Sequence, residues 1–477
     1  MRMLAEGDQT MEKKKTEGQK LEKDLSYKKE NFFVVSSDEK IKAAFDYAED
    51  YKKYIDLSKT EREAVKTSIA LCEEKGYKEY RFGDELKAGG RYYYNNRGKS
   101  LAVFKIGTAD VGKDGIRILA SHIDSPRLDI KQNPLYEDSS MAFLKTHYYG
   151  GIKKYQWTAI PLALHGTVAL KNGKTVDVAI GEGADDPVFY VNDLLPHLSR
   201  EQYAKNLSQA IDGETLNVLV GGLPFKDDDV KDAVKLTVLK HLHDDFGMCE
   251  SDFLSAELCV VPAFNARDIG FDRALIGAYG HDDRVCSYPA LTALLNEKDD
   301  EHTVLVVLAD KEEIGSEGNT GMQCKVYEDI IDIIAASQNK PSALVRANSV
   351  CLSADVTAGY DPNFAGVYEK KNASLVSYGT SVCKFTGSGG KSGSSDASAE
   401  LCGRVRKIFD DNKIVWQTAE LGKVDAGGGG TVAKFIAKLN IDTIDIGVPV
   451  ISMHAPYEVI SKGDLYSTYE AFAAFIK

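Results

Sequence analysis

Apolar runs of strand length alternate with helical patterns through most of this chain. Between about residues 37 and 75 the apolar positions have helical spacing, with Ser58 predicted as an N-cap and Gly76 as a stop. Residues 91–107 and 115–124 have the composition of strands separated by turns. Further along, the strand pattern HTVLVVLAD follows the helical pattern SYPALTALLNE. This order predicts an α/β domain.

The stretch from residue 128 to residue 273 interrupts that order. Here short β-like pieces (GTVALKNG, KTVDVAIG and LTVLKHLH) alternate with turns and with the polar stretch GGLPFKDDDVKD. The pattern predicts a β-rich domain, 128–273, inserted into a catalytic α/β domain made of residues 35–127 and 274–477. The first 34 residues are highly charged and are predicted to form an N-terminal arm, which serves either assembly contacts or no contact at all.

Composition narrows the class of protein. A length of 477 residues is sufficient for two domains, and a net charge of −13 argues against a partner made of nucleic acid. The sequence has no stretch typical of a signal peptide or a membrane span, so a cytoplasmic protein without a membrane partner is predicted. The eight cysteines form no Cys-x-x-Cys pair and are interpreted as buried thiols.

The apolar runs end on residues that bind metals or move protons. Because ligands bind beyond the carboxyl ends of strands in open α/β sheets, these residues are expected at one edge. Two histidines with several carboxylates are typical of a hydrolytic metal site. The residues are His122 and Asp124 in IRILASHID, Asp282 in GAYGHDDRV, Glu312 and Glu313 in VLADKEEIGS, Asp355 in SVCLSADV, and His454 in VPVISMH.

Each motif alone also has a plainer interpretation. HIDSP fits a solvated turn equally well, and the acids of DDR fit a helix start where the helix dipole favours them. The pair Glu312-Glu313 is the most specific, because adjacent acids after a buried strand can divide metal binding and proton transfer between them. The coincidence of five such positions favours the metal site.

Two small-residue segments are candidates for substrate binding. In KVDAGGGGTVAKF the glycines 427–430 precede a helical pattern, so the N–H groups at Gly428 and Gly429 can approach a substrate carbonyl or carboxylate. In KFTGSGGKSGSSDASAE the obvious cation is Lys391, although a flexible surface loop fits this segment as well.

Six motifs in this order resemble the aspartyl aminopeptidase family of two-metal aminopeptidases, in a bacterial form. They are ASHIDSPRLDIKQNP, GHDDRVCSYPAL, KEEIGSEGNTG, SADVTAGYDPNF, VDAGGGGTVAKF and ISMHAPYE, and they span nearly the whole chain beyond the arm. The resemblance implies a three-layer α/β/α peptidase domain carrying a β-rich oligomerisation domain. It also implies self-assembly into a tetrahedral homododecamer built from dimers.

The resemblance further implies a role for each candidate. Asp282 would bridge two ions, and His122 and Asp355 would be terminal ligands of different ions. Glu312 would be the general base, with Asp124 orienting His122. The implied metal ligands are His122, Asp282, Glu313, Asp355 and His454.

The resemblance gives two further residues a role, His165 in catalysis and Lys391 in substrate binding. The segment WTAIPLALHG would carry His165 into the site of a neighbouring subunit, and Lys391 would recognise an acidic side chain. The cofactor would be two divalent ions per subunit, with Zn²⁺ favoured and Co²⁺ or Mn²⁺ as alternatives.

The predicted function is hydrolysis of the first residue from peptides with a free N-terminus, with a preference for Asp or Glu. The alternatives are a preference for neutral first residues, or another metal-dependent hydrolase such as an N-acyl deacylase or a carboxypeptidase. A metal-stabilised assembly protein without turnover is a further alternative, which the extra acid Glu312 argues against.

Overall fold

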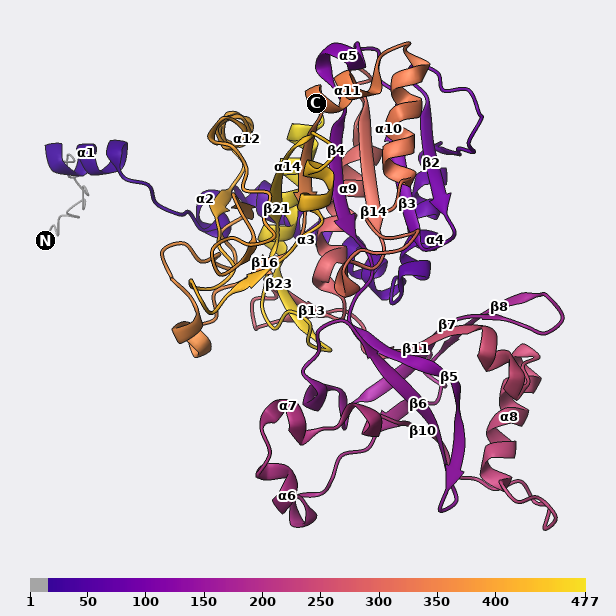
Figure 1. The fold of residues 1–477 in the computed structure, drawn as a ribbon. Coiled ribbons are helices and arrows are strands. Elements are labelled where there is room, and N and C mark those ends of the chain that lie inside the picture. Colours follow the sequence, from indigo (N-terminus) through magenta and orange to yellow (C-terminus); the bar gives the residue numbers. More distant parts are fainter. Residues whose placement is uncertain (1–15) are drawn as a thin grey trace, which may run out of the picture.

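A computed structural model describes residues 16–477, and the beginning of the predicted arm, residues 1–15, lies outside the described residues. Within this range nine strands form the mixed sheet of the larger domain (Figure 1). In their order across the sheet they are β1 (Lys78–Glu79), β2 (Arg91–Asn96), β3 (Ser100–Lys105), β14 (Val304–Ala309), β4 (Arg117–His122), β15 (Val350–Ala354), β21 (Asp442–Gly447), β17 (Thr380–Cys383) and β19 (Trp416–Thr418).

Helices cover both faces of this sheet. Successive residues of a strand point to opposite sides, and because its buried strands are apolar at successive positions, both faces have to be covered. Leu119 packs on one side with one group of helices, whereas Ile118 and Ala120 pack on the other side with the second group. The first group is α3 (Asp38–Asp56), α4 (Glu61–Glu74), α9 (His281–Asn296), α12 (Ala399–Asp411) and α14 (Lys462–Phe475). The second group is α5 (Val111–Asp114), α10 (Val326–Ser337), α11 (Ser342–Asn348) and α13 (Ala433–Ala437). The prediction of an α/β/α domain is confirmed.

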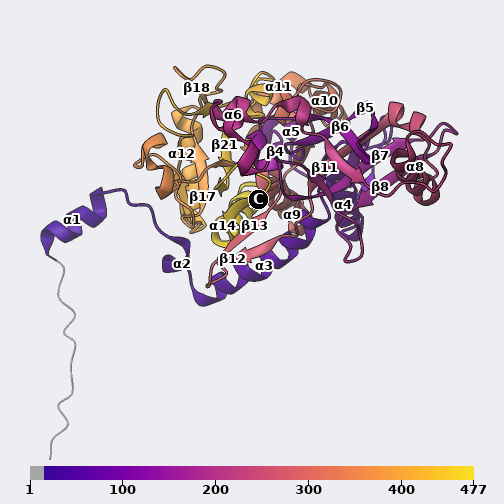
Figure 2. The same cartoon turned by 90° about the horizontal axis from the view of Figure 1, so that it is seen from below.

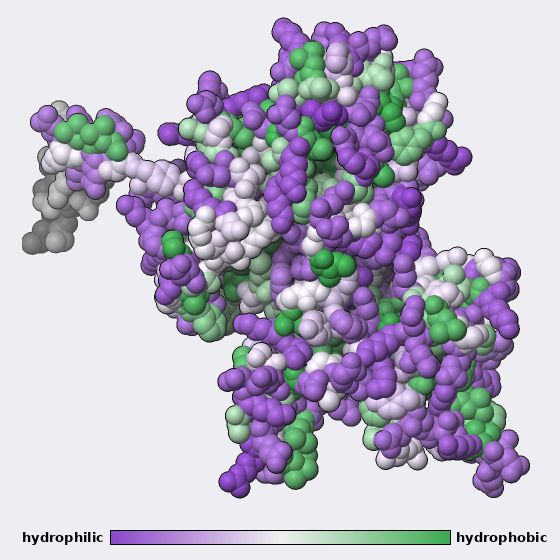
Figure 3. Space-filling model, in the orientation of Figure 1, coloured by the Kyte–Doolittle hydropathy of each residue, from purple (hydrophilic) through white to green (hydrophobic). Residues whose placement is uncertain are grey.

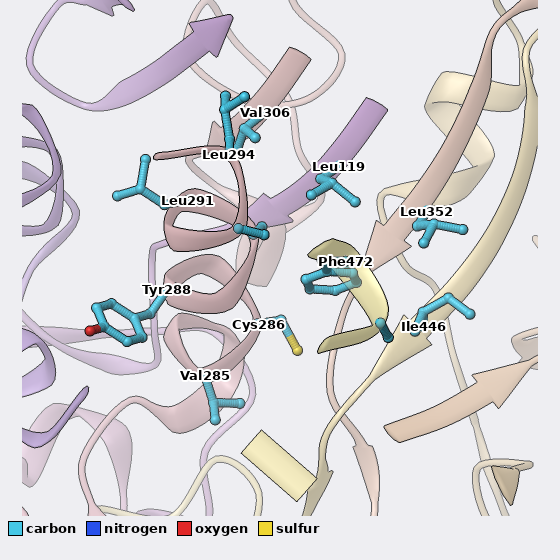
Figure 4. Close-up of a cluster of buried hydrophobic side chains, with 14 of the residues drawn as sticks. Leu119, Val285, Cys286, Tyr288, Leu291, Leu294, Val306, Leu352, Ile446 and Phe472 are labelled. Carbon is cyan, nitrogen blue, oxygen red and sulfur yellow. The ribbon is translucent and has the colours of Figure 1, made fainter. Parts of the chain in front are cut away.

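The central core lies between the sheet and the helices α9 and α14. Leu291 and Leu294 of α9 and Phe472 of α14 belong to the same buried cluster as the strand residues Val306 and Leu352. Figure 4 shows Leu294 next to Val306, and Phe472 on the side of α9 toward Leu352. All five side chains are fully buried, and α9 has a buried residue at nearly every position. Burying such side chains contributes about 1.5–3 kcal/mol each, so this core fixes the sheet edge from which the candidate site projects.

A second sheet forms the smaller domain below the first in Figure 1. Among the described residues it contains seven strands, and pairing of β11 with β7 closes six of them on one another. The strands are β11 (Ala256–Pro262), β5 (Arg127–Asp138), β6 (Met141–Tyr149), β10 (Val218–Gly221), β9 (Phe189–Val191), β7 (Pro161–Ala169) and β8 (Thr175–Ile180). The short helices α6 (Arg200–Tyr203) and α7 (Leu207–Ala210) belong to the same domain.

Small sheets complete the larger domain. β12 (Arg267–Ile269) pairs with β13 (Leu275–Ala278), which pairs with β23 (Glu458–Ser461), so the chain has rejoined the larger domain before residue 274. The other pairs are β16 (Thr357–Ala358) with β22 (Pro449–Val450), and β18 (Gly387–Ser388) with β20 (Gly428–Gly429). The exact domain boundaries stay a prediction.

Two local predictions were wrong. The piece LTVLKHLH lies in the helix α8 (Ala233–Phe246), not in a strand. The N-cap of α4 is Thr60 rather than Ser58, because Thr60 and Glu63 form a capping box in which each side chain accepts a hydrogen bond from the other's backbone. Gly76 does follow the end of this helix, with a φ of 79°.

The described part of the arm contains α1 (Glu17–Leu25) and α2 (Phe32–Val35). Helix α1 has no buried residue and stands apart from the body of the molecule in both ribbon views (Figures 1 and 2). Phe32 of α2, by contrast, is fully buried and lies against Gly463 of α14. Among residues 16–477 no helix has the length and apolar character needed to cross a membrane.

Candidate metal centre

Three neighbouring parallel strands deliver several of the candidate residues to one edge of the large sheet. Strand β4 lies between β14 and β15 and is parallel to both, so their carboxyl ends lie side by side. His122 is the last residue of β4, Asp355 directly follows β15, and Glu312 lies just beyond β14. The polar residues gather here because each buried strand ends at this edge.

Acidic and imidazole side chains from distant segments meet at this edge. The Nε2 atom of His122 lies 3.1 Å from Oδ1 of Asp282 and 4.0 Å from Oδ1 of Asp355. The Nε2 atom of His454 lies 3.2 Å from Oδ2 of Asp282 and 3.5 Å from Oε2 of Glu313. We call these five residues the Asp282 cluster. In the described part of the chain they make two groups of three, each with its ligand atoms within 4.8 Å of one another, and Asp282 belongs to both.

These two groups of ligand atoms differ in one respect from the ligand assignment that the family resemblance implies. His122 and Asp355 were expected to be ligands of different ions, but the structure places both with Asp282 in one group. The reason is the sheet: β4 and β15 are adjacent, so the residues at their ends lie together, whereas Glu313 and His454 approach from the other side of Asp282.

Hydrogen bonds orient both imidazole rings toward the cluster. The Nδ1 atom of His122 faces the Asp124 carbonyl at 3.1 Å and the Asp124 Oδ1 atom at 3.3 Å. The Nδ1 atom of His454 donates to the carbonyl of Gly151 at 2.7 Å. Because a carbonyl only accepts, Nδ1 carries a proton in both rings, so Nε2 is the atom that a metal can bind by displacing any proton held there, as in most histidine ligands of metals.

The cluster carries an excess of acid in a buried place. Burial raises the pKa of Glu313 and that of Asp355 well above the ordinary range, and neighbouring acids add to this effect. Burial lowers the pKa of His454, but hydrogen bonding to Asp282 and the charge of Glu313 outweigh it and raise that pKa to about 10. The Oε1 atom of Glu313 is buried without a hydrogen-bond partner among residues 16–477. Divalent cations would relieve this repulsion and satisfy that oxygen, so the donor set fits such ions.

Glu312 lies beside the cluster but outside both groups of ligand atoms. It begins a short 3₁₀ turn, Glu312–Ile314, flanked by Lys311 with a φ of 66° and Gly315 with a φ of 100°. Burial raises the pKa of the Glu312 carboxyl, and the charge of Asp124 adds to the effect, against that of His122. A carboxyl with a raised pKa beside a metal site is suited to proton transfer.

Two residues that support the site were not identified from the sequence. Glu458 is 2% exposed, and its carboxylate accepts hydrogen bonds from the backbone of His454 at 2.7 Å and of Asp282 at 3.1 Å. Its only signal in the sequence was an acid at the start of the short strand β23, before Val459 and Ile460. Tyr149, from the smaller domain, donates a hydrogen bond to Asp124 at 2.8 Å.

His165 lies away from the cluster. It is 2% exposed in the middle of β7, between β11 and β8, and its Nδ1 atom is 2.8 Å from Oε1 of Glu63. Its Nε2 atom is buried, 3.9 Å from Oε1 of Glu182. In this structure the side chain faces its own subunit, so a role in a neighbouring site stays a prediction.

The two small-residue segments pair with each other. Gly428 and Gly429 form β20, which is exposed and pairs with β18. Lys391 follows β18, lies over the ring of Phe385 and forms an ion pair of 3.3 Å with Asp396. The structure thus joins both candidate substrate segments in one small two-stranded antiparallel sheet. Their contact with substrate stays a prediction.

Comparison with known proteins identifies similar chains. A family described as aminopeptidase I zinc metalloprotease (M18) matches residues 54–476. A probable M18 family aminopeptidase 1 from Clostridium acetobutylicum is 46% identical over 461 residues, covering 95% of this chain and 99% of the relative. A crystal structure of an M18 aminopeptidase from Thermotoga maritima is 41% identical with a TM-score of 0.89, covering 95% of this chain and all (100%) of that one. A dodecamer of yeast aminopeptidase 1, 20% identical with a TM-score of 0.74 over 90% of this chain and 96% of that one, shares the fold.

Proposed function

The chain belongs to the aminopeptidase I zinc metalloprotease (M18) family, and from this premise we propose that it removes the first residue of peptides by means of two divalent cations held by the Asp282 cluster. The observation that carries the proposal is the pair of three-residue ligand groups that share Asp282. A single ion needs no such sharing, whereas a carboxylate with one oxygen toward each group is suited to bridge two.

The protein's own residues would divide the work as follows. His122 and Asp355 would hold one cation, Glu313 and His454 the other, and Asp282 both. Bound there, the cations would polarise the scissile carbonyl and lower the pKa of a water molecule.

Proton transfer would belong to Glu312. Its carboxylate would take the proton of the attacking water and pass it to the leaving amine, while Asp124 keeps His122 in place. Two features of Glu312 support this role: its carboxyl belongs to neither ligand group, and burial raises its pKa.

For the substrate we propose peptides with a free amino terminus and an acidic first residue, with neutral first residues as the alternative. Lys391 supports the acidic preference, since it is a partly exposed cation in the segment that pairs with the Gly428–Gly429 strand. We assign the native ions as Zn²⁺, with Co²⁺ or Mn²⁺ able to replace it, because imidazole and carboxylate suit all three.

For the whole protein we propose that residues 128–273 form an oligomerisation domain and that the chain assembles into a tetrahedral homododecamer. Exposed apolar side chains of this domain support the proposal, among them Leu198 at 68%, Tyr203 at 74% and Leu207 at 61% exposure.

The test is release of the first residue from short peptides beginning with Asp, Glu, Leu, Met or Lys. Each peptide is assayed after chelation and again with Zn²⁺, Mn²⁺ or Co²⁺ restored, next to N-acetylated controls. We expect metal-dependent cleavage of the free peptides only, fastest for Asp or Glu. Faster cleavage of Leu or Met peptides would retain the aminopeptidase and reject the acidic preference. Release of the acetyl group from the acetylated peptides, with no first residue released from the free peptides, would point to a deacylase and reject the proposal.

A further inference from the structure

The end of strand β6 belongs to the smaller domain yet touches the metal centre of the larger one. Tyr149, its last residue, donates a hydrogen bond from its hydroxyl to Oδ2 of Asp124 at 2.8 Å. Two residues later the carbonyl of Gly151 accepts the 2.7 Å hydrogen bond from His454. Between them, a Cβ added to Gly150 would lie 3.3 Å from both Cβ and Oε2 of Glu313.

The side chain of Tyr149 is held in one position. It is 9% exposed, and the guanidinium carbon of Arg127 lies 4.2 Å from its ring centroid. Arg127 is the direct cross-strand partner of Tyr149 and is itself fixed by hydrogen bonds to Glu61 and Asp129, both at 2.7 Å. The hydroxyl therefore reaches Asp124 from a rigid support.

Asp124 in turn joins the two halves of the site. Its Oδ1 atom accepts the backbone N–H of Glu312 at 3.1 Å and lies 3.3 Å from Nδ1 of His122. Its Oδ2 atom accepts the backbone N–H of Glu313 at 3.2 Å besides the Tyr149 hydroxyl. If this carboxylate turned, both the ring of His122 and the turn that carries the two glutamates would lose a support.

We propose that Tyr149 is a positioning residue: by fixing Asp124, its hydroxyl sets the affinity of the Asp282 cluster for its cations. Removing the hydroxyl leaves Oδ2 of Asp124, which is fully buried, with one donor fewer. The smaller domain then contributes to the metal centre of its own subunit, besides any part in assembly. This inference rests on the metal site proposed above.

The experiment measures Zn²⁺ affinity of the full-length protein by competition with a chelator. Tyr149→Phe keeps the ring and removes the hydroxyl, and Tyr148→Phe is the matched control, because its side chain is 44% exposed and points to the other side of the same strand. Residues that support metal ligands typically change affinity by about 10- to 100-fold. We expect at least about a tenfold loss for Tyr149→Phe at one or both sites and no change for Tyr148→Phe.

A double-mutant cycle tests whether the effect passes through Asp124. Tyr149→Phe is combined with Asp124→Asn, and the unfolding temperature of each metal-free variant shows that it is folded. We expect Tyr149→Phe to weaken binding far less in a protein that already carries Asp124→Asn than in the natural protein. Equal Zn²⁺ affinity of Tyr149→Phe and Tyr148→Phe would overturn the inference but not the proposed metal site. The same would follow if Tyr149→Phe lost as much affinity in the Asp124→Asn protein as in the natural one. If the natural protein bound no Zn²⁺, both the inference and the proposed metal site would be overturned.

Discussion

At the scale of single residues, the side chain with the sharpest expected effect is Glu312. In Glu312→Gln the amide can neither take nor return the proton of water, whereas the ligand atoms of the cluster are all retained. We expect peptide hydrolysis to fall by about 100- to 10,000-fold while the metal content stays unchanged. Elemental analysis and hydrolysis rates on the same sample measure both quantities.

The control for this change is Glu317→Gln, which makes the same substitution five residues later on the same loop. Glu317 is exposed, and its side chain accepts a hydrogen bond from Gln323 rather than facing the cluster. Undiminished turnover in Glu312→Gln would remove Glu312 from the mechanism. Loss of metal together with activity would show instead that its carboxylate serves as a ligand.

The residues that sequence reasoning identified share one property: they stand at or near the ends of apolar runs. His122 and Asp355 were found in this way, because a buried parallel strand leaves its mark in the sequence and its carboxyl end marks an edge. Tyr149 was missed because it comes from the second sheet, and no spacing along the chain records its approach to Asp124. Glu458 was missed because a single acid at the start of a strand is a common feature of surfaces.

At the scale of elements, the end of β6 is expected to be intolerant of added bulk. Gly150 has a φ of 74°, and in Gly150→Ala the new Cβ would lie 3.3 Å from the Glu313 side chain. Glu313 must therefore shift, and we expect weaker binding of the cation held with His454. Chelator competition with Zn²⁺ measures the loss.

Gly173→Ala separates this contact from backbone strain. Gly173 has a similar φ of 84° in the turn between β7 and β8, but a Cβ added there meets nothing within 4 Å. Both variants carry the cost of a left-handed alanine, about 1 kcal/mol, so only the contact distinguishes them. Equal Zn²⁺ affinity in the two variants would show that Gly150 is needed for its conformation rather than for its closeness to Glu313.

The two incorrect predictions, at α8 and at the start of α4, concern segments whose sequence fits two different patterns. In α8 the letters LTVL have the composition of a strand, but four apolar residues recur every four positions and form the inward stripe of a helix: Val234, Val238, Leu242 and Phe246. Gly247, with a φ of 71°, then ends it. At α4 the capping box of Thr60 and Glu63 was already present in the sequence, and Ser58, two residues before the true N-cap, was given too much weight.

At the scale of the whole molecule, the question is which surfaces each domain leaves exposed. The larger domain buries its sheet on both faces, and the smaller one leaves apolar side chains among its hydrophilic surface, as the lower part of the space-filling view shows (Figure 3). The larger domain exposes some apolar side chains as well, such as Phe364. The β-rich insertion was predictable because strand composition and turns mark it. The partner of this domain was not predictable, because exposed apolar side chains indicate a contact surface but do not identify what binds there.

Assembly is therefore the property to test by changing this surface. Replacing Leu198, Tyr203 and Leu207 by serine removes three apolar side chains around α6 and α7, none of which belongs to the Asp282 cluster. We expect the mass measured by light scattering to fall from that of a large oligomer to that of a smaller species, with bound metal unchanged. The comparison variant carries serine at Leu21 and Leu25 of α1, which are 52% and 80% exposed. A loss of mass in the α1 variant alone would assign assembly to the arm, and an unchanged mass in both would exclude these two surfaces.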